Sequence, residues 1–172
     1  MDCIEATHYH KNPLVRYFFR RKWNIAIEMA ELNKGDIILD FGCGEGYLKK
    51  VLKEHKVTGY DITPEHSDLK DYKEIKPTKI FVLDVFEHIP LIEIKKIIFA
   101  FKENYGSFRL ITIIPTENFI SRKLRRLVGK PEITEGHITK LKDIIDLLNK
   151  NLTLEKSKSF WTISYIASYI KE

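Results

Sequence analysis

A glycine-rich loop behind an acidic residue is the part of the sequence whose residue types and spacing best suit ligand binding. Asp40 ends an apolar run, and Gly42, Gly44 and Gly46 follow it at alternating positions before a helical pattern begins. Glycine lets the backbone turn sharply and approach a ligand closely. The free N–H groups of the following helix face the same crevice. The loop is therefore a candidate binding site.

Two further acidic segments follow at the ends of apolar runs. Residues 57–61 read as a strand that ends in the carboxylate of Asp61, about 20 positions after Asp40. An acidic residue at that place in a doubly wound sheet hydrogen-bonds ribose hydroxyls. The other segment, residues 80–90, leaves its apolar run with three side chains that could do chemistry: Asp84, Glu87 and His88.

Taken in order, the three segments resemble the class I S-adenosylmethionine-dependent methyltransferases. The loop resembles their motif I, and residues 80–90 resemble the strand-four motif of the subgroup that reads Leu-Glu-His-Ile or similar. A dinucleotide loop reads Gly-x-Gly-x-x-Gly, whereas Tyr47 stands where its last glycine would be, which disfavours a nicotinamide oxidoreductase. The resemblance implies a Rossmann-like methyltransferase fold with S-adenosyl-L-methionine as cofactor.

The resemblance also assigns residues to the cofactor. Asp40 would bind the amino end of the methionine moiety, directly or through water. Asp61 would take both ribose hydroxyls, since one carboxylate can accept from two donors. Cys43 is interpreted as a small loop residue and not as a nucleophile. The backbone of the loop and the end of the third segment, beside the sulfonium, would complete the site: Gly42, Cys43, Gly44, Gly46, Asp84 and Val85.

Glu87 and His88 are candidate catalytic residues. With Asp84 they lie at i, i+3 and i+4, so a helical turn would place them on one face. Ubiquinone-pathway O-methyltransferases resemble this stretch, and there the equivalent residues can hold a divalent cation that lowers the pKa of a catechol-like oxygen. Many relatives carry Glu-His here without metal. An acid/base role and a purely structural role for His88 stay open, and no metal ligand is assigned.

His137 is the third catalytic candidate, because the family often places a histidine over the acceptor pocket just before its penultimate helix. Histidine is the natural base near neutral pH; the alternative is a helix-start residue without chemistry. The basic run at 122–127 would belong to an acceptor-side helix at 119–129. These residues would either recognise an acidic or phosphorylated acceptor or form a solvated face of the helix. We expect this helix, Asp84, Glu87, His88 and His137 to share one cavity.

The alternation of strand and helix patterns predicts an α/β, doubly wound, mostly parallel sheet. Two strands joined by only two residues end the chain and must form an antiparallel hairpin. Strands are predicted at 36–41, 57–62, 79–83, 108–114, 152–160 and 163–170. Helices are predicted at 14–32, 46–55, 91–104, 119–128 and 139–149, the last capped by Thr139.

The fold is expected to be shortened after the second strand. Too few residues separate Asp61 from Asp84 for a crossover helix of about 10–12 residues plus a strand. We therefore expect the helix to be lost or reduced to a turn, with room for an extended strand within 69–75. Asp71 is a weak candidate for the adenine contact.

Length and composition indicate a globular protein. A chain of 172 residues predicts one domain over 1–172, with 1–34 as an N-terminal helical segment. Hydrophobic content of 44% and charged content of 31% exclude a disordered chain. No apolar run approaches the roughly 18 residues of a membrane span, so a cytoplasmic location without membrane contact is expected. The net charge of +5 suits nucleic acid, anionic substrates or simply a charged surface.

Three functions follow from these observations. The first is methyl transfer to a small-molecule acceptor, with oxygen slightly favoured over nitrogen or carbon. The second is an RNA methyltransferase, which a pI near 9.0 supports; the Asn/Asp-Pro-Pro-aromatic motif of exocyclic-amine methylation is absent from the sequence. The third is a non-catalytic protein that only holds the cofactor. The acceptor itself and the oligomeric state are not predicted.

Overall fold

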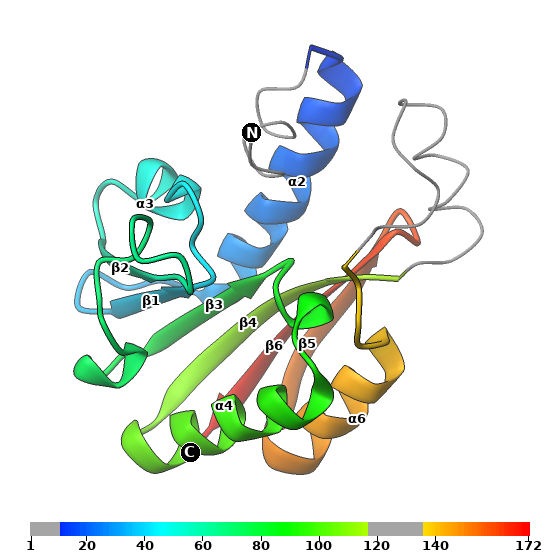
Figure 1. Ribbon diagram of the computed structural model, residues 1–172. Coiled ribbons are helices and arrows are strands. Elements are labelled where there is room, and N and C mark those ends of the chain that lie inside the picture. The colour runs from blue at the N-terminus through cyan, green and yellow to red at the C-terminus, as the bar shows by residue number, and fades with distance from the viewer. Residues whose placement is uncertain (1–10, 117–135) are drawn as a thin grey trace.

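The computed structural model describes residues 11–116 and 136–172, which form one sheet in the order β2-β1-β3-β4-β6-β5 (Figure 1). The strands are β1 (Ile37–Phe41), β2 (Lys56–Tyr60), β3 (Lys79–Leu83), β4 (Phe108–Pro115), β5 (Thr153–Phe160) and β6 (Ser164–Lys171). The helices are α2 (Pro13–Ala30), α3 (Tyr47–Val51), α4 (Leu91–Asn104) and α6 (Leu141–Asn151), with 3₁₀ turns η1 (Tyr72–Glu74) and η2 (Phe86–His88).

The sheet has the predicted class. Strands β1 to β4 are parallel, and β6 runs antiparallel to both β4 and β5. Residues 161–163 join β5 to β6, one residue more than predicted, and Trp161 and Thr162 lie in the left-handed region with φ of +50° and +57°. Two such residues give the turn type that matches the twist of a hairpin. The predicted mostly parallel sheet with an antiparallel C-terminal hairpin is confirmed.

Helices cover both faces of the sheet (Figure 1). Successive strand residues point to opposite faces, so the central strands read as unbroken apolar runs. In β3, Ile80 and Val82 join the core beneath α4 and α6. Phe81 and Leu83 join the core that α2 and α3 cover, which includes Trp23. The four parallel strands therefore present their carboxyl ends at one edge, between these layers.

The segment between β2 and β3 is shortened, as predicted. It contains no α-helix. The prediction of a strand within 69–75 is wrong, because η1 occupies part of that stretch. Strand β2 therefore lies at the edge of the sheet. Asp71 caps η1: its carboxylate accepts a hydrogen bond from the N–H of Lys73 at 3.0 Å. In this position Asp71 has a structural role.

Asp68 takes over the hydrogen bonds that a third strand would make with β2. Its N–H donates to the carbonyl of Gly59 at 2.9 Å, and its Oδ2 accepts from the N–H of Gly59 at 2.8 Å. Lys49 of α3 also donates to this carboxylate at 3.0 Å. One residue therefore satisfies both backbone groups of Gly59, and this explains how the fold dispenses with a neighbouring strand there.

Two helix predictions need comment. Helix α6 begins at Leu141, and Thr139 is not its cap, because the Thr139 hydroxyl donates instead to the carbonyl of Ile89 at 2.7 Å. The helix predicted at 119–128 lies outside the described residues. In residues 11–116 and 136–172, no helix combines the length and apolar content that a membrane crossing requires.

Asp68→Ala should lower the free energy of unfolding by about 1–2 kcal/mol, because it removes a charge-assisted bond to a buried backbone N–H. Lys49→Ala is the matched control: it breaks only the exposed pair and should cost less than about 1 kcal/mol. Urea unfolding measures both. Equal losses in the two variants would mean that the bond to Gly59 contributes nothing.

Candidate functional site

The glycine loop is held against the end of β2. The N–H groups of Gly42 and Cys43 both donate to the carbonyl of Tyr60, at 2.7 and 3.2 Å. Gly42, Gly44 and Gly46 have φ values of +79°, +46° and +68°. The loop therefore follows a path that favours glycine at all three alternating positions.

Two glycines allow neighbouring strand ends to approach each other closely. A Cβ at Gly42 would lie 2.5 Å from a methyl carbon of Val85, which follows β3. A Cβ at Gly59 in β2 would lie 2.6 Å from the sulfur of Cys43. Side chains at these positions would separate the loop from both neighbouring strands. The loop, the end of β2 and the end of β3 thus form one packed unit.

Asp61, which follows β2, binds the glycine loop through its carboxylate. Its Oδ2 accepts a hydrogen bond from the N–H of Gly44 at 2.9 Å, and its Oδ1 accepts from the N–H of Thr63 at 2.9 Å. A carboxylate oxygen has two lone pairs. Both oxygens can therefore still accept a hydrogen bond from the hydroxyl groups of a ligand.

Asp40 is a buried carboxyl group beneath the loop, with only 3% of its surface exposed. Its Oδ2 has no hydrogen-bond partner among the described residues. Burial, with smaller contributions from the negative charges of Asp61 and Asp68, raises the pKa of Asp40 to about 7. A cation bound beside this oxygen would stabilise the ionised form.

Cys43 is a buried, free cysteine. Burial, followed by the charges of Asp40, Asp61 and Asp68, raises the pKa of its thiol to about 12. The thiol therefore stays protonated near neutral pH, whereas a nucleophile needs the thiolate. The side chain instead bonds to the neighbouring segment, with its sulfur 3.3 Å from the carbonyl of His66.

Asp84 forms an ion pair with Lys22 of α2. The Lys22 ammonium lies 2.7 and 2.6 Å from the two carboxylate oxygens and only 3% of Lys22 is exposed. Asp84 has φ of +57°, a conformation that aspartate tolerates better than most residues. The ammonium also lies 4.7 Å from the ring centre of Phe19. The pair fastens α2 to the end of β3.

Sequence reasoning missed Lys22. Its neighbours Arg20 and Arg21 make the residue look like part of a solvated basic run. The signal lies in the spacing: Lys22 is seven residues after Val15 and four before Ala26, and both belong to the buried stripe of α2. A lysine at a core position of a helix indicates an internal carboxylate partner.

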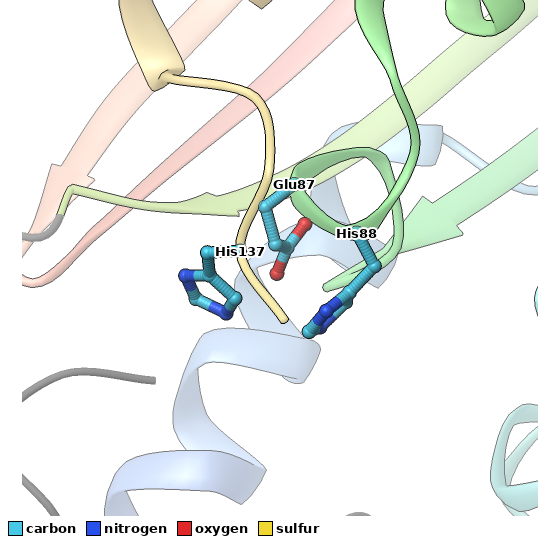
Figure 2. A group of neighbouring side chains, drawn as sticks. All are labelled: Glu87, His88 and His137. Atoms are coloured by element: carbon cyan, nitrogen blue, oxygen red, sulfur yellow. The ribbon is translucent and has the colours of Figure 1, made fainter. Parts of the chain in front are cut away.

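Glu87, His88 and His137 come together beside η2, although they are far apart in the sequence (Figure 2). One potential ligand atom from each lies within 4.8 Å of the others. The rings of His88 and His137 meet edge to face, with centroids 4.7 Å apart. Asp84, which was expected in the same cavity, is bonded to Lys22 instead. The helix at 119–129, also expected there, lies outside the described residues.

A groove of about 410 Å³ opens beside the loop, between α3 and the segment after β2. Most predicted site residues do not line it: Gly42, Asp61, Asp84, Val85, Glu87, His88 and His137 are absent from its walls. The predicted site residues that do line it are Asp40, Cys43, Gly44 and Gly46. The groove therefore touches one side of the loop, and His88 and His137 lie elsewhere.

Solved structures of S-adenosylmethionine-dependent methyltransferases share this fold. Magnesium protoporphyrin IX methyltransferase from Synechocystis with bound SAH has a TM-score of 0.64 and 19% identity, covering 94% of this chain and 88% of that one. The N-methyltransferase NodS from Bradyrhizobium japonicum, in complex with S-adenosyl-L-homocysteine, has a TM-score of 0.64 and 15% identity, covering 94% and 89%. The predicted methyltransferase fold is confirmed.

A protein from Pyrococcus horikoshii has a TM-score of 0.71 and 15% identity, covering 98% of this chain and 96% of that one. No protein-family model and no curated protein sequence matches the chain. At these identities the similarity concerns the fold.

Lys22→Met should lower the free energy of unfolding by about 2–4 kcal/mol, because Asp84 loses its partner. This is somewhat below the cost of breaking a fully buried pair, since 27% of the Asp84 side chain is exposed. Urea unfolding measures the loss, and Asp84→Asn in the same chain should recover part of it. Arg21→Met is the control: it breaks an exposed pair with Glu28 and should cost less than about 1 kcal/mol. A loss no larger than that of the control would contradict a structural role for the pair.

Asp40→Asn should stabilise the protein at alkaline pH. The carboxyl has a pKa of about 7 in the native state against 3.8 as its ordinary value. The native state therefore holds the proton more tightly, and this stabilisation is present below about pH 4 and lost as the pH rises through 7. The free energy of unfolding of the variant should exceed that of the wild type by up to about 4 kcal/mol at pH 8. The difference should be clearly smaller at pH 5. Urea unfolding at both pH values measures this difference. The same difference between variant and wild type at pH 5 and pH 8 would refute the raised pKa of Asp40.

Proposed function

We propose that this chain, which has the fold of the S-adenosylmethionine-dependent methyltransferases, binds S-adenosyl-L-methionine at its glycine loop and transfers the methyl group to a small-molecule acceptor. The observation that carries the proposal is Asp40, a buried carboxyl beneath the loop with an oxygen that makes no hydrogen bond among the described residues. An ammonium group suits such an oxygen. The methionine end of the cofactor carries one.

The other end of the cofactor would lie at the end of β2. Asp61 retains lone pairs for the two ribose hydroxyls after bonding Gly44 and Thr63. Ile62 follows directly and is 91% exposed. An apolar side chain in water beside a ribose-binding carboxylate offers a surface that the adenine can cover. Sequence analysis missed Ile62, because only its exposure distinguishes it from a core residue.

Methyl transfer requires little covalent chemistry from the protein. An acceptor lone pair forms a bond to the methyl carbon while the carbon–sulfur bond breaks, and its electron pair stays on sulfur. The chain aligns the two reactants and excludes water. In open α/β sheets ligands bind beyond the carboxyl ends of the strands. Glu87 and His88 follow Val85 there, His137 lies beside them, and we assign all three to the acceptor side.

An oxygen acceptor, rather than nitrogen or carbon, is favoured by the Glu-His pair after β3. The basic run at 122–127, which supports an acidic acceptor or RNA, lies outside the described residues. A protein that holds the cofactor without turnover would account for the shortened segment after β2. Turnover with a panel of small hydroxylated acceptors separates this last function from the first. A cytoplasmic location and a single domain over 1–172 stay predictions.

Calorimetry should show binding of S-adenosylmethionine and of its demethylated product, and no binding of NAD. Asp61→Ala should weaken binding by about 1.5–3 kcal/mol, the range for lost hydrogen bonds to a charged group. Asp71→Ala is the matched control, because that carboxylate caps η1. The affinity of this variant for S-adenosylmethionine should stay within a few tenths of a kcal/mol of the wild type. Binding of NAD alone, or no effect of Asp61→Ala, would overturn the assignment.

A further inference from the structure

We propose that Glu87, His88 and His137 form a binding site for a divalent transition-metal cation, of which Zn²⁺ is the best example. The three side chains converge on one space between η2 and residues 136–138 (Figure 2). Two imidazole nitrogens and one carboxylate oxygen are ligands that Zn²⁺ and its neighbours accept readily. Magnesium prefers oxygen ligands and suits this set less well.

The spacing of the three side chains fits one ion. Zinc bonds of about 2.1 Å at tetrahedral angles place two ligand atoms roughly 3.5 Å apart. One ligand atom from each residue lies within 4.8 Å of the other two. His88 is exposed and His137 partly exposed, so small side-chain rotations can close the remaining gap. Glu87 is only 2% exposed and forms the inner wall of the site.

The hydrogen bond of His88 prepares its ring for a metal. Its Nδ1 lies 3.1 Å from the carbonyl oxygen of Gly136. A carbonyl can only accept, so Nδ1 carries the proton and Nε2 presents its lone pair. Metal-binding imidazoles in proteins are oriented in the same way, by a hydrogen bond from the other ring nitrogen.

Backbone hydrogen bonds hold the two halves of the site together. The N–H groups of Ile138 and Thr139 both donate to the carbonyl of Glu87, at 2.7 and 3.2 Å. The Thr139 hydroxyl donates to the carbonyl of Ile89 at 2.7 Å. His137 is thereby fixed against η2 by bonds on the residues that follow it. The site is therefore built before any ion binds.

This set of ligands differs from the one that the sequence resemblance suggested. In the ubiquinone-pathway enzymes that this stretch resembles, the equivalent of Asp84 can take part in holding a cation, but here both Asp84 oxygens are bonded to the Lys22 ammonium. His137 takes its place from the other side of η2. The change replaces an oxygen ligand by an imidazole, and this shifts the preference from magnesium towards zinc-like ions.

The inference deepens the proposed function and rests on it for its chemical meaning. Three protein ligands leave coordination positions open, and the exposed side of His88 gives access to them. A cation there favours acceptors that offer an oxygen, because it lowers the pKa of a coordinated hydroxyl. The acceptor class is then a small molecule with a phenol-like or catechol-like hydroxyl. In this arrangement the two histidines hold the cation and do not act as the base.

Metal binding is tested on the whole chain, stripped with a chelator and titrated with ZnCl₂ in a calorimeter. We expect one Zn²⁺ per chain with weaker binding of Mg²⁺. His88→Ala, His137→Ala and Glu87→Gln should each lower the affinity for Zn²⁺ by about tenfold or more. His55→Ala, in the turn between α3 and β2, is the control for other histidines and should leave the affinity unchanged. Co²⁺ should give visible bands without a thiolate charge-transfer band.

Unchanged affinity in His88→Ala and His137→Ala, or an equal loss in the control, would overturn the site. Thermal unfolding of each variant separates lost ligands from lost folding, and Glu87→Gln preserves the shape of the side chain. Binding of S-adenosylhomocysteine is measured on the same samples. Zinc binding without cofactor binding would refute the proposed function and leave the metal site standing. Cofactor binding without zinc binding would refute the metal site alone.

Discussion

The close approach of three strand ends is the constraint on which the rest of the structure depends. Gly42 packs against Val85 and Gly59 against Cys43, at distances that leave no room for a Cβ atom. Because the strands meet this closely, Asp40 in β1 and Asp61 after β2 lie around one loop. A side chain at either glycine would push a strand end away and separate the groups of the site. The two glycines thus keep the loop and the ends of β2 and β3 together.

The negative charges at this edge of the sheet lower the stability of the free protein and also suit the binding of a cationic group. Asp40 lies buried near Asp61 and Asp68, so its ionised form is costly in the free protein. A cationic ligand group removes that cost, and a site of this kind gives up some stability for binding. At the neighbouring strand end the chain supplies its own cation, because Lys22 neutralises Asp84. Asp40 lies within β1 and Asp84 directly follows β3, and of the two only Asp40 keeps an oxygen without a partner among the described residues.

Sequence predicted the features that depend on local pattern. The runs at 79–83 and 91–104 have the predicted bounds, because apolar stretches between turn signals define their own ends. It did not predict Lys22 or Asp68, whose partners are known only once distant segments meet. Thr139 was misread for the same reason: its hydroxyl donates to the carbonyl of Ile89, and helix α6 begins at Leu141 without it. The His88–His137 pair was expected to share a cavity, but its contact geometry required the folded chain.

Both outer strands of the sheet carry charge, and this bears on how copies of the chain meet. An edge strand with free N–H and carbonyl groups is a template for pairing with another chain, and charged side chains along it discourage such pairing. On β2, the groups of Gly59 are already bonded to Asp68. On β5, Lys156 and Lys158 stand in a strand that is exposed along most of its length. The carboxylate that replaces a missing strand therefore also protects the molecule from edge-to-edge aggregation.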